Sequence, residues 1–258
     1  MKKNKKKKYI ITSLAWISLL ILWYLATKLN WVNTVLCPSP QKVLLTFILL
    51  CKHGYAGIPL WKHLMITLSR LFIALILAIV TGIPLGLASG SIPTFYDFID
   101  SFIQFYRPIP PLAYYSLLIL WMGIGESPKI VLLYLAALAP IYLASVSAIK
   151  NVSNKYIESA EMLGLSKKQI FIKVLLPAAL PEIFTGIRSG VGFAYTTLVS
   201  AEMIAATDGI GWMIINASKY LNSSVMFVGI IILGITGIAL DVILRELEKH
   251  IIFWKGNL

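Results

Sequence analysis

The sequence predicts an all-α, polytopic membrane protein with about six transmembrane helices. Hydrophobic residues make up 58% of the 258 residues and charged residues only 13%, against about 25% charged in soluble domains. Several apolar runs are long enough to cross a bilayer. Basic residues flank these runs and are more numerous on one side. A single polytopic domain follows, and a soluble enzyme is disfavoured because its core helices are usually shorter.

The first expected span is an uncharged run, Tyr9–Ala26, which follows a lysine-rich N-terminus. A secretory signal peptide has a similar charged start, but its apolar run is shorter and an A-x-A-like cleavage site follows it. No such site follows here, so an uncleaved span is favoured. The lysines that hold the N-terminus in the cytoplasm are Lys2, Lys3, Lys5, Lys6, Lys7 and Lys8.

Five further spans are expected at later apolar runs. They cover Leu64–Ala88, Phe98–Gly123, Lys129–Ile149, Ile183–Ala206 and Val225–Leu244. An even number of spans places both termini and the loop Lys150–Glu182 in the cytoplasm. The inner segments carry more Lys and Arg than the outer ones, as this topology requires. The net charge of +12 therefore reflects topology and lipid contact, and nucleic acid is not an expected partner because no reading motif accompanies the charge.

The longest outer segment is Thr27–Lys62, in which a short surface helix is expected at Gln41–Leu50. Cys37 and Cys51 lie in this segment, where an outward location permits a disulfide; two free thiols are the alternative. His63 near Cys51 matches no zinc spacing. The chain also has no phosphate-binding loop and no cluster of catalytic side chains. It is therefore expected to have no catalytic, metal-binding or cofactor-binding residue.

Small residues recur every four positions in two of the expected spans. Such faces let helix backbones approach closely where lipid supplies no hydrophobic driving force. We expect helix packing at Gly82, Gly86, Gly90, Gly186 and Gly190.

Five ionisable residues fall within or at the edges of spans: Arg70, Arg107, Arg188, Glu202 and Asp241. Each would cost about 2.5–3.5 kcal/mol at a helix centre. Arg70, Arg107 and Asp241 are expected to reach an interface by snorkelling, and Arg188 fits positive-inside anchoring. Glu202 is either part of a gate or pathway, or a satisfied packing carboxylate. Candidates for the pathway or gate are Arg107, Arg188 and Glu202.

The segment Tyr106–Pro111 contains three prolines in four residues, which a regular helix cannot accommodate. A plain loop before a span near Leu112 is one interpretation, and a broken helix that lines the pathway is the other. We expect proline turns near the cytoplasmic mouth.

The polar loop between the fourth and fifth spans contains helix signals of its own. A helix of about Ser153–Leu163 would end at Gly164, which supplies a left-handed terminator. Ser166 and Gln169 fit a capping box, and Pro177 is expected to end the second helix. Two short helices joined by a tight turn predict a docking element on the cytoplasmic face.

This loop resembles the EAA loop of ABC-transporter permeases. In that motif Glu-Ala-Ala is followed, after three residues, by Gly, and after nine more by a branched aliphatic residue, any residue, and Leu-Pro. The matching residues are Glu158, Ser159, Ala160, Gly164, Val174, Leu176 and Pro177. Ser159 and Val174 are mild departures, and the spacing matches in full.

The resemblance implies the type I ABC importer fold, with a cytoplasmic coupling helix. Two permease chains would form the pathway, a homodimer in lipid. Two ATPase subunits would bind ATP and Mg and dock on the loops, and an extracytoplasmic binding protein would deliver substrate at the inner or plasma membrane of a prokaryote. The implied contacts with the ATPase are Glu158, Ser159, Ala160, Leu163, Gly164 and Leu165.

Most of the chain from about Leu36 is similar to the permeases of taurine importers and to the related aliphatic-sulfonate, nitrate and bicarbonate group. The similar stretches are Pro38–Val43, Tyr106–Pro111, Leu120–Glu126, Leu180–Arg188, Ala201–Gly211 and the tail Phe253–Gly256. Taurine is the first expectation for the substrate, then other alkanesulfonates, then nitrate or bicarbonate.

The expected organisation is an N-terminal transmembrane helix with its outer loop (1–62), a permease domain (63–248) and a cytoplasmic tail (249–258). Two other classes remain as alternatives. A secondary transporter would need inverted repeats and no ATPase dock. A membrane-embedded enzyme would need clustered His, Asp or Cys residues at one interface. The docking loop and the three histidines argue against both.

Overall fold

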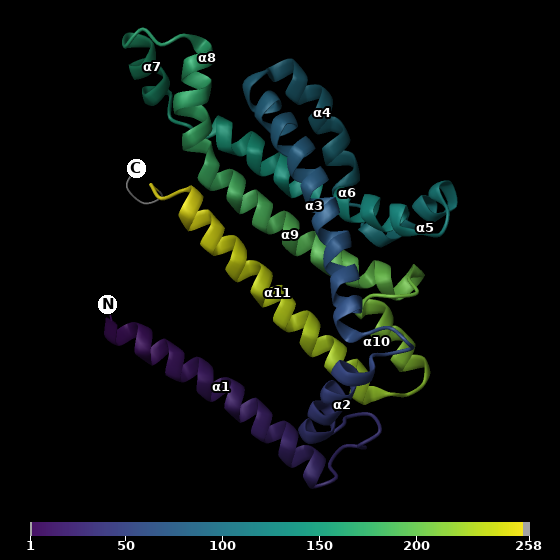
Figure 1. Ribbon diagram of the computed structural model, residues 1–258. Coiled ribbons are helices and arrows are strands. Elements are labelled where there is room, and N and C mark those ends of the chain that lie inside the picture. The colour runs from purple at the N-terminus through teal and green to yellow at the C-terminus, as the bar shows by residue number, and fades with distance from the viewer. Residues whose placement is uncertain (1, 255–258) are drawn as a thin grey trace. The chain divides into compact units, whose positions relative to one another are not determined.

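The computed structural model describes residues 2–254, and the side chains from residue 11 on. Within that part, all regular structure is helical apart from one isolated bridge between Tyr55 and Ile58, which confirms the all-α class. The helices (Figure 1) are α1 Lys2–Lys28, α2 Pro40–His53, α3 Leu60–Ser91, α4 Pro93–Tyr106, α5 Pro111–Met122, α6 Glu126–Lys150, α7 Asn154–Met162, α8 Lys167–Ile170, the π-helix η1 Phe171–Leu175, α9 Leu176–Ala205, α10 Ile210–Lys219 and α11 Ser223–Ile251.

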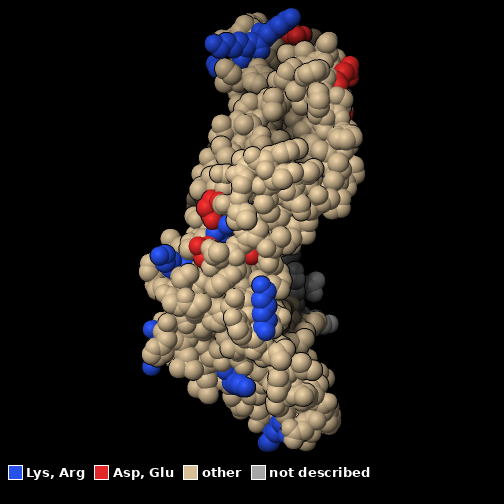
Figure 2. Space-filling view, turned by 90° about the vertical axis from the view of Figure 1, so that its right-hand side faces the viewer, with Lys and Arg blue, Asp and Glu red and all other residues tan. Residues whose placement is uncertain are grey.

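Five helical segments in the described part are long and apolar enough to cross a membrane. They are Ile11–Lys28 of α1, α3, α6, the run Lys167–Ala205 from α8 to α9, and α11. Their outward faces are apolar: among the exposed large apolar side chains of α3, exposure runs from 46% for Leu77 to 66% for Trp61. Most of the face in Figure 2 is likewise uncharged, and Lys, Arg, Asp and Glu gather in a few places on it. Such a surface suits lipid or another protein chain.

The expected third span, Phe98–Gly123, is not one helix. It is divided into α4 and the 12-residue α5, with the proline segment between them. Pro108, Pro110 and Pro111 cannot donate backbone hydrogen bonds, which explains the break. The expectation of an interrupted third span is confirmed, while its boundaries as a single helix were wrong.

Contacts divide the chain into two units, each described by itself: unit 1 holds the residues up to Met65 and Asp208–Gly234, and unit 2 holds Ile66–Thr207 and the residues from Ile235 on. The core of unit 1 joins α2, the start of α3, α10 and the first turns of α11 through Val43, Leu50, Leu60, Ile210, Met213, Ile214, Ala217, Val225 and Val228. Trp23 of α1 stacks on Phe227 with ring centroids 5.5 Å apart.

The expected surface helix in the outer segment is confirmed as α2. Ser39 caps it, because its hydroxyl accepts a hydrogen bond from the Lys42 N–H. Cys37 and Cys51 are both free thiols in the structure. Of the two alternatives, a disulfide or two free thiols, the structure therefore has the second.

The core of unit 2 is built around α6, with α3 and α9 against it. The buried side chains of this core are Leu71, Ala74, Leu75 and Ala78 on α3; Leu133, Ala137, Ile141, Ala148 and Ile149 on α6; Ala179, Ile183, Ile187, Val191, Ala194 and Leu198 on α9; and Leu240 on α11. α4 packs on α6 through a smaller cluster that contains Ile103, Tyr142 and Val146.

The five packing glycines all face α6. A Cβ on Gly86 of α3 would lie 2.4 Å from the Cβ of Ser145, and one on Gly186 of α9 would lie 2.3 Å from the Cβ of Ala144. Gly82, Gly90 and Gly190 have contacts of the same kind with Ile141, Leu138 and Ile149 of α6. Backbones of three helices therefore approach to distances that only glycine permits, as in small-residue packing in membranes.

The second short helix of the loop does not end at Pro177, which corrects the sequence expectation. α8, η1 and α9 are consecutive, and together they form the helical run Lys167–Ala205. The π-helical turn changes the hydrogen-bond pattern just before Pro177, which lies at the start of α9. Proline is tolerated in the first turn of a helix because its missing N–H is not needed there.

Candidate functional site

The docking element consists of α7, the turn at Gly164 and α8, which Figure 1 shows together at one end of unit 2. Its two ends are held together at the base, since the side-chain amide of Asn151, after α6, donates to the Glu182 carboxylate on α9 at 3.2 Å. The element thus projects from two long helices that are tied to each other.

The turn at Gly164 is a Schellman motif. Gly164 has φ 76°, in the left-handed region that the sequence predicts. The Leu165 N–H donates to the Ala160 carbonyl at 3.1 Å, and the Gly164 N–H donates to the Glu161 carbonyl at 2.9 Å; these are the two bonds of that motif. The capping box is also present, because Ser166 and Gln169 bond each other's backbone N–H reciprocally.

Of the expected ATPase contacts, Glu158, Ser159, Leu163 and Gly164 are exposed, Leu165 is half-buried and Ala160 is buried. Ala160 and Leu165 occupy the positions whose side chains usually pack together in a Schellman motif. Ala160 is buried and therefore poorly placed for contact with a partner, whereas Leu165 keeps part of its surface exposed. Sequence reasoning missed Met162, which is 88% exposed beside Leu163 at 80%. Two adjacent exposed apolar side chains at a helix end could have signalled it.

A C-terminal residue lies near the same element. Trp254 lines a cavity with Tyr156 of α7, Lys173 and Val174 of η1, and Pro177 and Ala178 of α9. The part of the expected tail at 255–258 lies outside the described residues, as do the side chains of the N-terminal lysines.

A buried charge cluster joins the ends of α3, α6 and α9 that lie opposite the docking element. Arg70 is 1% exposed, and its Nη1 donates to Glu202 Oε1 at 2.7 Å while its Nε donates to Glu126 Oε2 at 2.6 Å. Thr67 donates to the same Glu202 carboxylate at 2.9 Å, and Lys129 donates to Glu126 at 2.8 Å. The expectation that Arg70 snorkels to an interface was wrong, because its buried guanidinium is held by the buried Glu202 carboxylate and by Glu126, whose side chain is 54% exposed.

Arg188 and Asp241 form a second link, between α9 and α11. Arg188 lies 3.3 Å from Asp241 and 3.5 Å from Glu248, and Arg245 lies 2.7 Å from Asp241. The expectation for Asp241, snorkelling alone, was incomplete because arginines on two helices hold it. Arg188 is likewise occupied by carboxylates.

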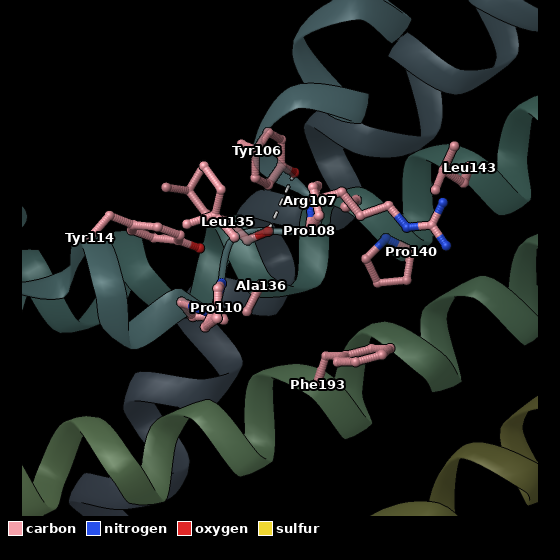
Figure 3. A pocket seen from close by; sticks show the side chains of 13 residues that line it. Tyr106, Arg107, Pro108, Pro110, Tyr114, Leu135, Ala136, Pro140, Leu143 and Phe193 are labelled. Carbon is pink, nitrogen blue, oxygen red and sulfur yellow. Dashed lines mark hydrogen bonds between the residues drawn. The ribbon is translucent and has the colours of Figure 1, made fainter.

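Arg107 lies in a different setting, at a cavity of about 240 Å³. Figure 3 shows the proline segment, Tyr114 of α5 and Phe193 of α9 around the α6 residues Leu135, Ala136, Pro140 and Leu143. These α6 residues lie in the middle of Glu126–Lys150. The expected position of the proline turns, near the cytoplasmic mouth, was therefore wrong: packing against α6 places them beside the centre of a span. Sequence reasoning gave no signal for Tyr114 or Phe193.

His63 has a structural role in unit 1. Its Nδ1 accepts from the Gly209 N–H at 3.1 Å, and its Nε2 lies 3.3 Å from the Tyr55 carbonyl oxygen. The Tyr55 hydroxyl donates to Asn216 at 2.9 Å, and burial raises the pKa of that hydroxyl above its usual range. No group of three or more His, Cys, Asp or Glu residues that would hold a metal occurs among the described residues.

Comparisons with known proteins agree with this arrangement. Residues 79–253 match the family model described as "Binding-protein-dependent transport system inner membrane component". The taurine transport system permease protein TauC of Escherichia coli K12 is 40% identical over 240 residues, which are 93% of this chain and 87% of that protein. The putative aliphatic sulfonates transport permease protein SsuC of the same organism is 37% identical and covers 96% of this chain and 94% of its own length.

A nitrate import permease protein, NrtB of Synechocystis, is 32% identical over 91% of this chain and 86% of its own length. Among solved structures, a chain from inward-facing conformations of the MetNI methionine ABC transporter has a TM-score of 0.55 and is 21% identical; the match covers 72% of this chain and 91% of that chain. At this identity the likeness concerns the fold alone.

Proposed function

The chain belongs to the family of binding-protein-dependent ABC permeases, and from that premise we propose that it forms the translocation pathway of an importer for taurine or a closely related alkanesulfonate. It is a non-catalytic, multi-pass permease subunit of the group that includes TauC, SsuC and NrtB proteins. The single observation that carries the choice of substrate is the 40% identity to TauC over 93% of this chain. Nitrate, bicarbonate or another small anion is the second candidate, supported by the 32% identity to NrtB.

In this proposal ATP and Mg are bound by a separate ATPase subunit, and an extracytoplasmic binding protein delivers the substrate. The docking element supports the first partner: it exposes Met162 and Leu163 at the C-terminal end of α7, where the Schellman turn terminates the helix. Burial of such apolar side chains in a cleft would supply binding free energy, roughly 1.5–3 kcal/mol for each that becomes fully buried. Two copies of the chain would enclose the pathway, with both termini in the cytoplasm.

ATP binding would close the two ATPase subunits, and the docking elements would move with them as rigid levers. The proposal gains support from the tie between Asn151 and Glu182 and from the uninterrupted helical run from Lys167 to Ala205. A push on α7 and α8 would pass into α6 and α9, and so to the charge cluster at their other ends.

The test is reconstitution of the chain with its ATPase and binding protein in vesicles. Uptake of radiolabelled taurine is measured with and without ATP inside, beside methanesulfonate, butanesulfonate and nitrate. We expect ATP-dependent uptake of at least one sulfonate and stimulation of ATP hydrolysis by the loaded binding protein. Import of nitrate with no sulfonate imported would support the second candidate, and uptake without ATP would contradict coupling to an ATPase.

A further inference from the structure

The cavity beside the proline segment is a built space at the centre of two membrane-spanning helices. Its walls come from the turn after α4, the first turns of α5, the middle of α6 and Phe193 in the middle of α9. Irregular backbone at such a depth is tolerated where it is buried in protein or lines a water-filled cavity. The position of the proline segment therefore matches that of a pathway lining.

Arg107 gives this cavity a positive charge. Among the described residues, no carboxylate oxygen lies within 4.0 Å of its guanidinium, whereas Arg70, Arg188 and Arg245 each have such a partner. Figure 3 shows the guanidinium extended over Pro140 towards Leu143. Arg107 is an exposed residue, so a ligand can reach its guanidinium, and an arginine within a membrane-spanning bundle usually has a functional reason. A passing anion would provide a counter-charge.

Two further groups give the cavity polar character. The Tyr114 hydroxyl points into it from α5 (Figure 3), and the Tyr106 hydroxyl donates only a long bond, 3.4 Å, to the Leu135 carbonyl. Both hydroxyls can donate to an oxyanion. Pro140 has no N–H to offer to the carbonyl of Ala136, four residues earlier, and both residues line the cavity. That carbonyl is an acceptor suited to an ammonium group.

The remaining wall is apolar, with Ile109, Ala139, Pro140, Leu143 and Phe193. At about 240 Å³ the cavity is smaller than the roughly 300–1,000 Å³ of sites for drug-sized ligands. It suits a compact anion that has a short alkyl part. Nitrate has no apolar part that would use this wall, so the cavity favours an organic anion.

We propose that this cavity is a transient site for the sulfonate within the permease itself, a proposal that deepens the proposed function and rests on it. The Arg107 guanidinium binds two sulfonate oxygens through its fork of N–H donors. Figure 3 shows the Tyr114 hydroxyl on the other side of Pro110 and Leu135 from the guanidinium, so this hydroxyl donates to the third oxygen only when the Arg107 side chain turns towards α5. The alkyl chain lies against Pro140 and Phe193, and an amino group, where the substrate has one, faces the Ala136 carbonyl. Selectivity for the anion then resides partly in this chain and not only in the binding protein.

The first test uses the complete importer in vesicles, with the binding protein saturated by taurine. The variants are Arg107→Gln, Arg107→Lys and Tyr114→Phe, and the matched control is Lys52→Gln, which removes the charge of an exposed lysine on α2 that does not line the cavity. We expect Arg107→Gln to lower taurine uptake about tenfold or more, as for loss of a hydrogen bond to a charged group, while the binding protein still stimulates ATP hydrolysis. Arg107→Lys and Tyr114→Phe should give taurine uptake rates between those of Arg107→Gln and the unmodified importer. The control should transport taurine at the unmodified rate.

The second test is direct binding of radiolabelled taurine to the purified permease–ATPase complex without its binding protein. We expect weak, saturable binding that Arg107→Gln abolishes and that excess methanesulfonate displaces. Phe193→Trp should reduce the cavity and impair butanesulfonate uptake more than methanesulfonate uptake. Each variant is first checked for an intact complex by gel filtration.

The outcomes separate the two proposals. Sulfonate uptake at the unmodified rate in both Arg107→Gln and Tyr114→Phe would overturn the site and leave the proposed function standing. Equal loss of ATP hydrolysis and uptake in Arg107→Gln would also overturn it, since that result indicates a structural role. An unmodified importer that carries no sulfonate would overturn the proposed function and the site together.

Discussion

The guanidinium of Arg70 on α3 and the carboxylate of Glu202 on α9 form a buried ion pair, with Nη1 2.7 Å from Oε1 and neither side chain more than 1% exposed. Glu126, the first residue of α6, shares the same arginine. One cation therefore holds three helices together at the end opposite the docking element. A movement that separates these helix ends must break or rearrange this cluster, so the pair is suited to stabilise one conformation of the pathway.

The first prediction is that Glu202→Gln leaves the protein inserted but lowers both its melting temperature and its transport rate. The amide keeps the shape and still accepts from Thr67, but Arg70 loses one of its two counter-charges. Breaking a buried pair costs roughly 3–5 kcal/mol when a charge is left alone, and Glu126 should reduce that loss. Thermal unfolding of the purified complex and vesicle uptake measure the effect.

The matched control is Glu246→Gln, which removes an exposed carboxylate paired with Lys249 on α11. Because exposed pairs contribute little, this variant should behave like the unmodified chain. Normal melting and normal uptake in Glu202→Gln would mean that the pair is dispensable.

The second prediction concerns the close contact of α3 and α6 at Gly86. Gly86→Ala should lower the melting temperature, because the new Cβ would lie 2.4 Å from Ser145 Cβ and 2.7 Å from the Tyr142 carbonyl oxygen. Overpacking of this kind costs about 1–3 kcal/mol. Gly192→Ala on α9 is the control, since nothing lies within 4 Å of its added Cβ, and alanine is the better helix former. Equal melting temperatures for the two variants would exclude tight packing at Gly86.

The third prediction is that Gly164→Val weakens association with the ATPase while membrane levels stay near normal. The left-handed φ of 76° costs a residue with a Cβ about 1–2 kcal/mol, and relief of that strain would redirect Met162 and Leu163. No atom lies within 4 Å of an added Cβ, so the effect is conformational and not steric. Co-purification and stimulated ATP hydrolysis are the measurements.

Gly164→Asn separates conformation from side-chain size at this position. Asparagine tolerates the left-handed region better than valine, so this variant should retain most of the coupling. Full coupling in the valine variant would show that the turn does not position the contact.

The fourth prediction is the topology: Cys51 is external, and both termini and Lys168 are cytoplasmic. The charge asymmetry of the loops motivates it, and Cys51 is an exposed free thiol. In a Cys37→Ser background, a membrane-impermeant thiol reagent should label Cys51 on intact cells. After Lys168→Cys in a chain without other cysteines, labelling should require permeabilised membranes. Labelling of the cysteine introduced at position 168, but not of Cys51, on intact cells would contradict the predicted topology.

The sequence by itself determined the helical membrane class and the local geometry of the docking element. The left-handed turn at Gly164 and the capping box of Ser166 and Gln169 were both predictable. Each of these features depends on backbone conformation and on hydrogen bonds between residues only a few positions apart. The glycines at intervals of four were visible for the same reason, because the helical repeat places them on one face.

Only the tertiary structure decided which distant groups meet. Arg70 and Glu202 are 132 positions apart, and nothing local distinguishes an arginine that snorkels from one that two carboxylates neutralise inside a bundle. The cavity at Arg107 likewise exists because the proline segment packs against the centre of α6. Charge pairing and cavity formation depend on the packing of whole helices. The burial that results from this packing decides whether a charge needs a partner. Local sequence determines only the shape of each helix and its turns.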